Sequence, residues 1–140
     1  MRAVAVGAAA ALALIPVSAS AVDSLFSYPW TASAKLVSDD GLVFTVYLHP
    51  KHNSLLLQPR MSEILGSEGT KGPTGWGTNI WRHAAEYFVQ PIGCGVSDID
   101  PVSKSGATWE AQVVCPPGVD LHLLMRDQHD ALLRGEPLHR

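Results

Sequence analysis

The stretch CGVSDIDPVSKSGATWEAQVVC, from Cys94 to Cys115, contains both cysteines of the chain and reads as two extended segments joined by a turn. Residues 94–102 and 108–115 are the two extended candidates. Between them, residues 103–106 are the residue types that favour turns. The stretch therefore predicts an antiparallel hairpin.

The position of that turn decides whether the two sulfur atoms meet. If the turn is centred between Lys104 and Ser105, Cys94 faces Cys115, and facing Cα atoms lie about 4.5 to 5.5 Å apart, within disulfide range. A bond there constrains the unfolded chain by roughly 3 kcal/mol at most. Pro101 cannot donate to a strand ladder, so we expect its strand at a sheet edge or with a bulge, which would shift the register by one residue. We predict a structural disulfide.

Redox catalysis and metal binding explain the two cysteines less well. Redox-active cysteines usually stand two residues apart at the start of a helix, where the helix dipole lowers one thiol pKa. Here the spacing is far wider, and no helix is expected to begin at either cysteine. A metal site needs further ligands, and no histidine lies between the two cysteines.

The first 21 residues have the three-part plan of a secretory signal peptide. Arg2 precedes an apolar run from Ala3 to Ile15, and Pro16 ends that run. Residues 19–21 are small, as a signal peptidase requires. The run is shorter than the roughly 20 residues of a membrane span. We expect export to the periplasm or the medium, where disulfides form; an uncleaved membrane anchor is the alternative.

Residues 22–140 then form one globular domain, without a transmembrane segment. The full chain has a net charge of −3, and its positive charges are scattered singly. Nucleic acid and anionic lipid attract clustered Lys and Arg, so both are poor candidates as partners. We expect a protein or an envelope component as the partner and no cofactor.

A second hairpin is predicted from residues 30–38 and 42–49, which flank Asp39-Asp40-Gly41. An Asp-Gly step between apolar runs is a strong hairpin signal, because Gly tolerates positive φ. Leu55 to Leu57 are apolar enough to contact the core, but their secondary structure is ambiguous. A short helix is expected near Met61 to Leu65.

Two longer helices complete the predicted fold. The first follows Thr78 or Asn79, either of which is a candidate N-cap, and its apolar face recurs at spacings of three and four. The second is expected across residues 119–134, with Asp120 near its N-terminus. The faces comprise Trp81, Ala84, Ala85 and Phe88 in the first helix, and Leu121, Leu124, Met125, Gln128 and Leu132 in the second. We predict a small α+β domain of antiparallel hairpins packed with two helices and one disulfide.

Two features are candidate sites. Residues 66–78 form a glycine-rich segment, interpreted as a mobile surface loop, and Trp76 within it is either a ligand-binding anchor or a residue that folds back onto the core. His49 and His52 are the closest histidine pair and weak metal-ligand candidates. Pro50 between them argues against a helix that would align the two imidazoles.

No recognised catalytic motif occurs in the chain: G-x-S-x-G, S-x-x-K, H-E-x-x-H and the glycine-rich phosphate loops are all missing. The sequence therefore favours a non-catalytic binding or envelope-associated protein over an enzyme. The alternative is a periplasmic hydrolase or metal-dependent enzyme that uses scattered His and carboxylate side chains, with His49 and His52 among them.

Overall fold

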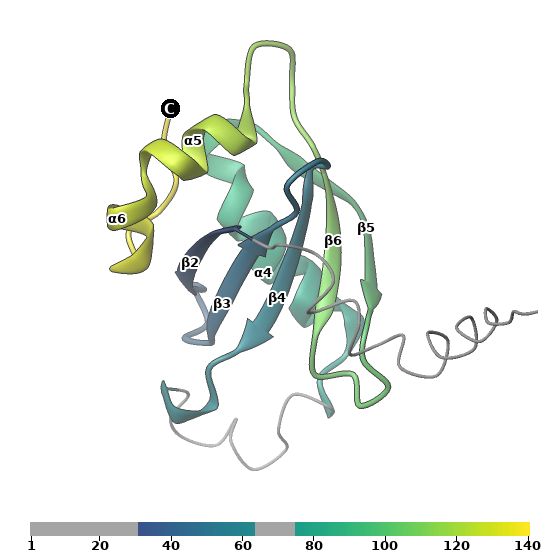
Figure 1. Ribbon diagram of the computed structural model, residues 1–140. Coiled ribbons are helices and arrows are strands. Elements are labelled where there is room, and N and C mark those ends of the chain that lie inside the picture. The colour runs from purple at the N-terminus through teal and green to yellow at the C-terminus, as the bar shows by residue number, and fades with distance from the viewer. Residues whose placement is uncertain (1–30, 64–74) are drawn as a thin grey trace, which may run out of the picture.

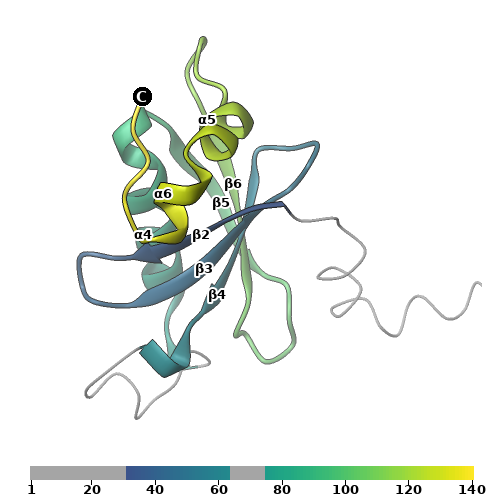
Figure 2. The same cartoon turned by 60° about the vertical axis from the view of Figure 1, so that its left-hand side comes forward.

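The computed structural model describes residues 31–63 and 75–140. Within those residues the chain forms one five-stranded antiparallel sheet in the order β2-β3-β4-β6-β5, with its helices packed on one face (Figures 1 and 2). The strands are β2 (Thr31–Val37), β3 (Val43–Leu48), β4 (Ser54–Pro59), β5 (Gly95–Pro101) and β6 (Trp109–Val114). The helices are α4 (Thr78–Val89), α5 (Leu121–Asp127) and α6 (His129–Leu133).

The predicted hairpin around Asp39-Asp40-Gly41 is confirmed as β2 and β3, which pair in antiparallel register. Gly41 has a φ of 86°, a left-handed conformation in which a side chain would be strained. The turn is closed by the Gly41 N–H, which donates to the Ser38 carbonyl at 3.0 Å, and by the Ser38 hydroxyl, which donates to Asp40.

The segment with ambiguous structure, Leu55 to Leu57, lies in the central strand β4. This strand pairs with β3 on one side and β6 on the other, so the two predicted hairpins belong to a single sheet. All three leucines are buried, although neighbouring residues of a strand point to opposite faces. A strand that is buried on both faces has no alternating pattern, which is why its sequence did not identify it.

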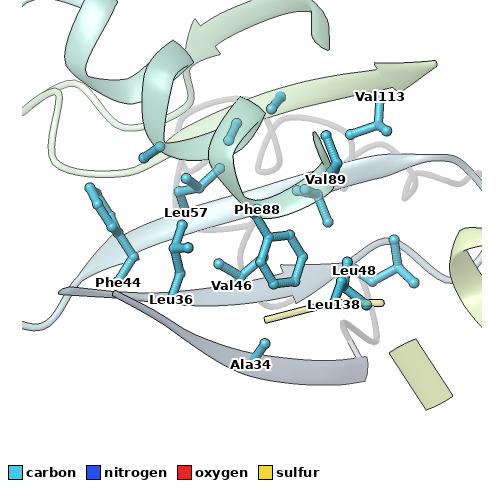
Figure 3. Packing of buried hydrophobic residues seen from close by; sticks show 14 of the residues in the cluster. Ala34, Leu36, Phe44, Val46, Leu48, Leu57, Phe88, Val89, Val113 and Leu138 are labelled. Carbon is cyan, nitrogen blue, oxygen red and sulfur yellow. The ribbon is translucent and has the colours of Figure 1, made fainter. Parts of the chain in front are cut away.

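The predicted face of α4 is confirmed, since Trp81, Ala84, Ala85 and Phe88 are all buried against the sheet. In Figure 3, Phe88 lies beside Val46 in the layer between α4 and the strands. The predicted side-chain cap is wrong. The N-cap residue is Gly77, in an extended conformation, and no side chain bonds to the first helical N–H groups. After α4, residues 90–92 make one 3₁₀ turn, and Gly93 has a φ of 86°.

Strands β5 and β6 form the predicted second hairpin, and Cys94 and Cys115 are joined by a disulfide with Cα atoms 4.2 Å apart. Near the turn, Pro101 pairs with Trp109, so that part of the ladder is centred on Ser105 rather than between Lys104 and Ser105.

A bulge at Ser97 then shifts the register by one residue, between Val96 and Asp98. Beyond it Val96 pairs with Val113 and Gly95 with Val114, the register in which the two cysteines face each other. The bulge therefore aligns the two cysteines. Pro101 lies in the edge strand β5, where the N–H group that proline lacks is not needed for a ladder hydrogen bond.

The single helix predicted over residues 119–134 is instead two short helices, α5 and α6, interrupted at Gln128. Asp120 is the N-cap of α5, and its carboxylate accepts the Leu123 N–H at 3.1 Å. Leu121, Met125 and Leu132 are buried, as the predicted stripe requires. The domain accordingly has three helices in its described part rather than two.

Several expectations fall on parts of the chain outside the described residues. These are the signal peptide at residues 1–21, the first residue of the strand expected over residues 30–38, and most of the glycine-rich segment at residues 66–78. The short helix expected over residues 61–65 is a 3₁₀ turn at Met61–Glu63, and Leu65 lies beyond the described range. In the same described ranges, no helix is both long and apolar enough to pass through a bilayer.

Candidate functional site

One end of the sheet brings together segments that are far apart in sequence, and we call it the disulfide end. It comprises the Cys94–Cys115 bond, the β3–β4 turn at residues 49–53, and residues 116–120, which lead into α5. In Figure 1 it is the upper end of the sheet. The Val113 N–H donates to the Asn53 carbonyl at 2.8 Å and so ties the turn to β6.

The β3–β4 turn carries His49 and His52, and α5 adds His122; we call these three residues the histidine cluster. The His49 and His52 rings lie 4.6 Å apart, between centroids. His122 Nε2 lies 2.8 Å from the His49 carbonyl oxygen. His49 is only 6 % exposed, because it ends the central part of the sheet beneath α5. The structure therefore joins to the predicted pair a third imidazole from more than seventy positions further along the chain.

The hydrogen bonds of the histidine cluster define where its protons are. A carbonyl oxygen only accepts, so His122 Nε2 must carry a proton. A backbone N–H only donates, so His49 Nδ1, which lies 2.9 Å from the Lys51 nitrogen, must present a lone pair. Burial lowers the pKa of His49, and the charges of His52, His122 and Lys51 lower it further. His49 is thus held in its neutral form.

This arrangement does not favour His49 as a metal ligand. A neutral imidazole has one ring lone pair, and that of His49 already accepts the Lys51 N–H. A metal ion would have to displace this bond. Across residues 31–63 and 75–140, no group of three or more His, Cys, Asp or Glu side chains is placed to hold a metal ion.

A shallow apolar cleft lies beside the disulfide end, and we call it the α5 cleft. Its volume is about 220 Å³, and its lining residues are Pro117, Gly118, Val119, Asp120, Leu123, Leu124 and Arg140. Leu123 is 41 % exposed there. The Arg140 guanidinium donates to the Ile92 carbonyl through Nη2 at 3.1 Å and Nε at 3.2 Å, which fixes one wall of the cleft.

Trp76, the candidate ligand-binding residue of the glycine-rich segment, lies at the opposite end of the sheet and is only 9 % exposed. Its ring packs edge-on against Phe44, at 6.0 Å between centroids, and against Trp81 at 5.4 Å. Trp81 in turn stacks on Trp109. Of the two alternatives for Trp76, the position that the structure gives it is the one folded back onto the core.

A second histidine contact connects α4 to the β2–β3 turn. His83 Nε2 lies 2.7 Å from Asp39 Oδ1, and this hydrogen bond raises the pKa of His83. Both side chains are about half exposed. The carboxylate of Asp39 favours the charged imidazole of His83. The pKa of His83 is therefore raised, whereas that of His49 is lowered.

Comparison of the chain with models of protein families, with curated proteins and with solved structures finds no match. Its function is therefore inferred from the geometry of the disulfide end and from the sequence.

Proposed function

We propose that this chain is an exported, disulfide-stabilised domain that acts by binding a protein partner. The observation that supports export most directly is the Cys94–Cys115 disulfide, because such bonds persist in oxidising compartments and are rare in the cytosol. The signal-peptide pattern of residues 1–21 supports the same location. The mature protein is then residues 22–140, in the periplasm or the medium.

The α5 cleft is the surface that we assign to binding. Pro117, Val119, Leu123 and Leu124 give it an apolar lining, and the side chain of Leu123 is available to a partner. Its volume of about 220 Å³ is smaller than the roughly 300–1,000 Å³ of sites that enclose a small-molecule ligand. The cleft has room for one or two apolar side chains from a protein segment, which is the occupant we propose.

Both walls of the cleft are held before any partner arrives. The disulfide fixes the residues that follow Cys115, and the Arg140 bonds to Ile92 fix the C-terminal wall. A preformed surface loses little conformational entropy on binding, which favours affinity from a small contact area.

Export is tested by expressing the full-length chain and a form that lacks residues 1–21 in a bacterial host, followed by cell fractionation and N-terminal sequencing. We expect the full-length gene to yield a periplasmic or secreted protein that starts near residue 22. The truncated form should stay in the cytosol. Recovery of the full-length chain in the cytosol with Met1 intact contradicts the proposal.

Binding at the cleft is tested by cross-linking the mature protein to an envelope fraction of its source cells, with matched variants. Leu123→Glu places a charge in the cleft, and Leu133→Glu places one on α6 at a residue that is exposed to the same extent. We expect one specific protein to cross-link to the wild type and to Leu133→Glu but not to Leu123→Glu. A partner that is retained equally by both variants contradicts the assignment to the cleft.

A further inference from the structure

Among the described residues, His49 makes three hydrogen bonds that hold the β3–β4 turn. Its N–H donates to the Ser54 carbonyl at 2.9 Å and closes the turn. Its Nδ1 accepts the Lys51 N–H at 2.9 Å and shapes the turn from inside. Its carbonyl accepts from His122 Nε2 at 2.8 Å and attaches the turn to α5. The local structure of the turn and its contact with α5 therefore meet at one residue, through its backbone groups and its titratable ring.

A proton on Nδ1 is incompatible with this turn. An imidazolium ring has N–H groups at both nitrogens and no acceptor. Once Nδ1 takes a proton from solvent, two donors face each other across 2.9 Å where His49 Nδ1 meets the Lys51 N–H. The Lys51 N–H must then turn away, and the turn cannot keep its present shape.

The charged and titratable groups that the turn and α5 place beside His49 oppose the same proton. Lys51 and His52 belong to the turn itself, and His122 comes from α5. After burial, these three groups are the causes that lower the pKa of His49. Because these groups lie on both the turn and α5, the repulsion favours separation of the two segments and not only a rotation of the His49 ring.

We propose that the β3–β4 turn holds α5 in a pH-sensitive way. Protonation of His49 at Nδ1 opens the turn and breaks its contact with α5. In neutral surroundings the turn is closed and α5 is attached to it through His122. In acidic surroundings the Lys51 N–H loses its acceptor, the turn opens, and the N-terminal turn of α5 loses the His49 carbonyl. His83 does not work in this way, because its carboxylate partner Asp39 stabilises the charged ring.

The test follows the Lys51 amide in the mature protein by NMR hydrogen exchange between about pH 7.5 and 5, as protection relative to the intrinsic exchange rate. In the wild type we expect protection to fall by about tenfold, as the loss of one ordinary hydrogen bond implies. The midpoint of this change should coincide with the titration midpoint of the His49 ring. If protection is constant, or follows the titration of His52 or His122 instead, the proposal is overturned.

Two variants sharpen the result. In His49→Asn, the Asn carbonyl oxygen can accept the Lys51 N–H as in an Asx turn, but it does not titrate. We expect its Lys51 amide to keep the same protection at both ends of the pH range. His129→Asn, on α6, removes a histidine outside the cluster and should behave as the wild type. Acid opening that persists in His49→Asn overturns the proposal, and the wild-type titration decides the question alone if that variant does not fold.

Discussion

The side-chain amide of Gln128 pairs with both backbone groups of His139. Its Oε1 accepts the His139 N–H at 3.0 Å, and its Nε2 donates to the His139 carbonyl. The neighbouring residue Leu138 is buried in the core with 1 % of its surface exposed. The one polar residue in the apolar stripe of the last helices therefore holds the C-terminal segment where Leu138 can pack.

Replacement of Gln128 by Ala should loosen this segment. Both hydrogen bonds are lost, and we expect the free energy of unfolding to fall by about 1 kcal/mol, with faster exchange of the His139 amide. Gln128→Glu keeps the acceptor but loses the donor, so its effect should be smaller at the His139 amide. Urea denaturation and hydrogen exchange measure the two effects. An unchanged exchange rate in Gln128→Ala would show that the pairing contributes nothing.

Deletion of Ser97 tests how the cysteines come into register. Ser97 is the extra residue of the bulge, and its removal lets Val96 continue the ladder directly from Asp98. Cys94 should still face Cys115, so we expect alkylation of the denatured protein to find no free thiol. Insertion of a second serine after Ser97 is the matched control and should lower the yield of disulfide. Free thiols in the deletion variant would show that the bulge does not set the register.

Truncation of Trp76 distinguishes a core residue from a binding anchor. Since Trp76 packs against Phe44 and Trp81, Trp76→Ala should lower the free energy of unfolding by about 3 kcal/mol. Val114→Ala, at a position that is 60 % exposed, serves as the control and should change it little. Stability that is the same in Trp76→Ala and the wild type would contradict the core assignment.

The pairing of His83 with Asp39 predicts a loss of stability at alkaline pH. The Asp39 carboxylate raises the pKa of His83 above its ordinary value of 6.5, so the folded state binds the proton more tightly than the unfolded state. This contribution is fully present below about pH 6.5 and is lost as the pH rises through the raised pKa. In His83→Gln this alkaline decline should disappear.

The contribution of His49 to stability has the opposite pH dependence, because burial and the neighbouring groups lower the pKa of His49. Its contribution is present above about pH 6.5 and is lost as the pH falls through the lowered pKa. Urea denaturation between about pH 5 and 9 should therefore show the acid decline unchanged in His83→Gln. If His83→Gln and the wild type have the same profile on the alkaline side, the hydrogen bond to Asp39 does not stabilise the fold.

The parts of the fold that were predicted correctly depend on contacts close together in sequence. An Asp-Gly turn sets the first hairpin, a spacing of three and four sets the buried face of α4, and turn residues at 103–106 indicate the second hairpin. In each case the signal lies within a few residues of the structure that it specifies.

The parts that were missed depend on contacts between distant segments. The strand β4 is recognisable only in the assembled sheet, where it pairs with β3 and β6 and Leu55 to Leu57 are all buried. The interruption between α5 and α6 falls at Gln128, which pairs with His139 eleven positions further on, and no Gly or Pro marks it in the sequence. The histidine cluster needs His122, and nothing in the sequence near His49 indicates that partner.

The most direct test of the whole account measures the thiols of this chain as it exists in the cell. Cells are quenched in acid, the protein is denatured and alkylated without reductant, and its intact mass is determined. We predict a chain without residues 1–21 and without any alkylated cysteine. A chain that still begins at Met1 and carries alkyl groups on both Cys94 and Cys115 would contradict the account.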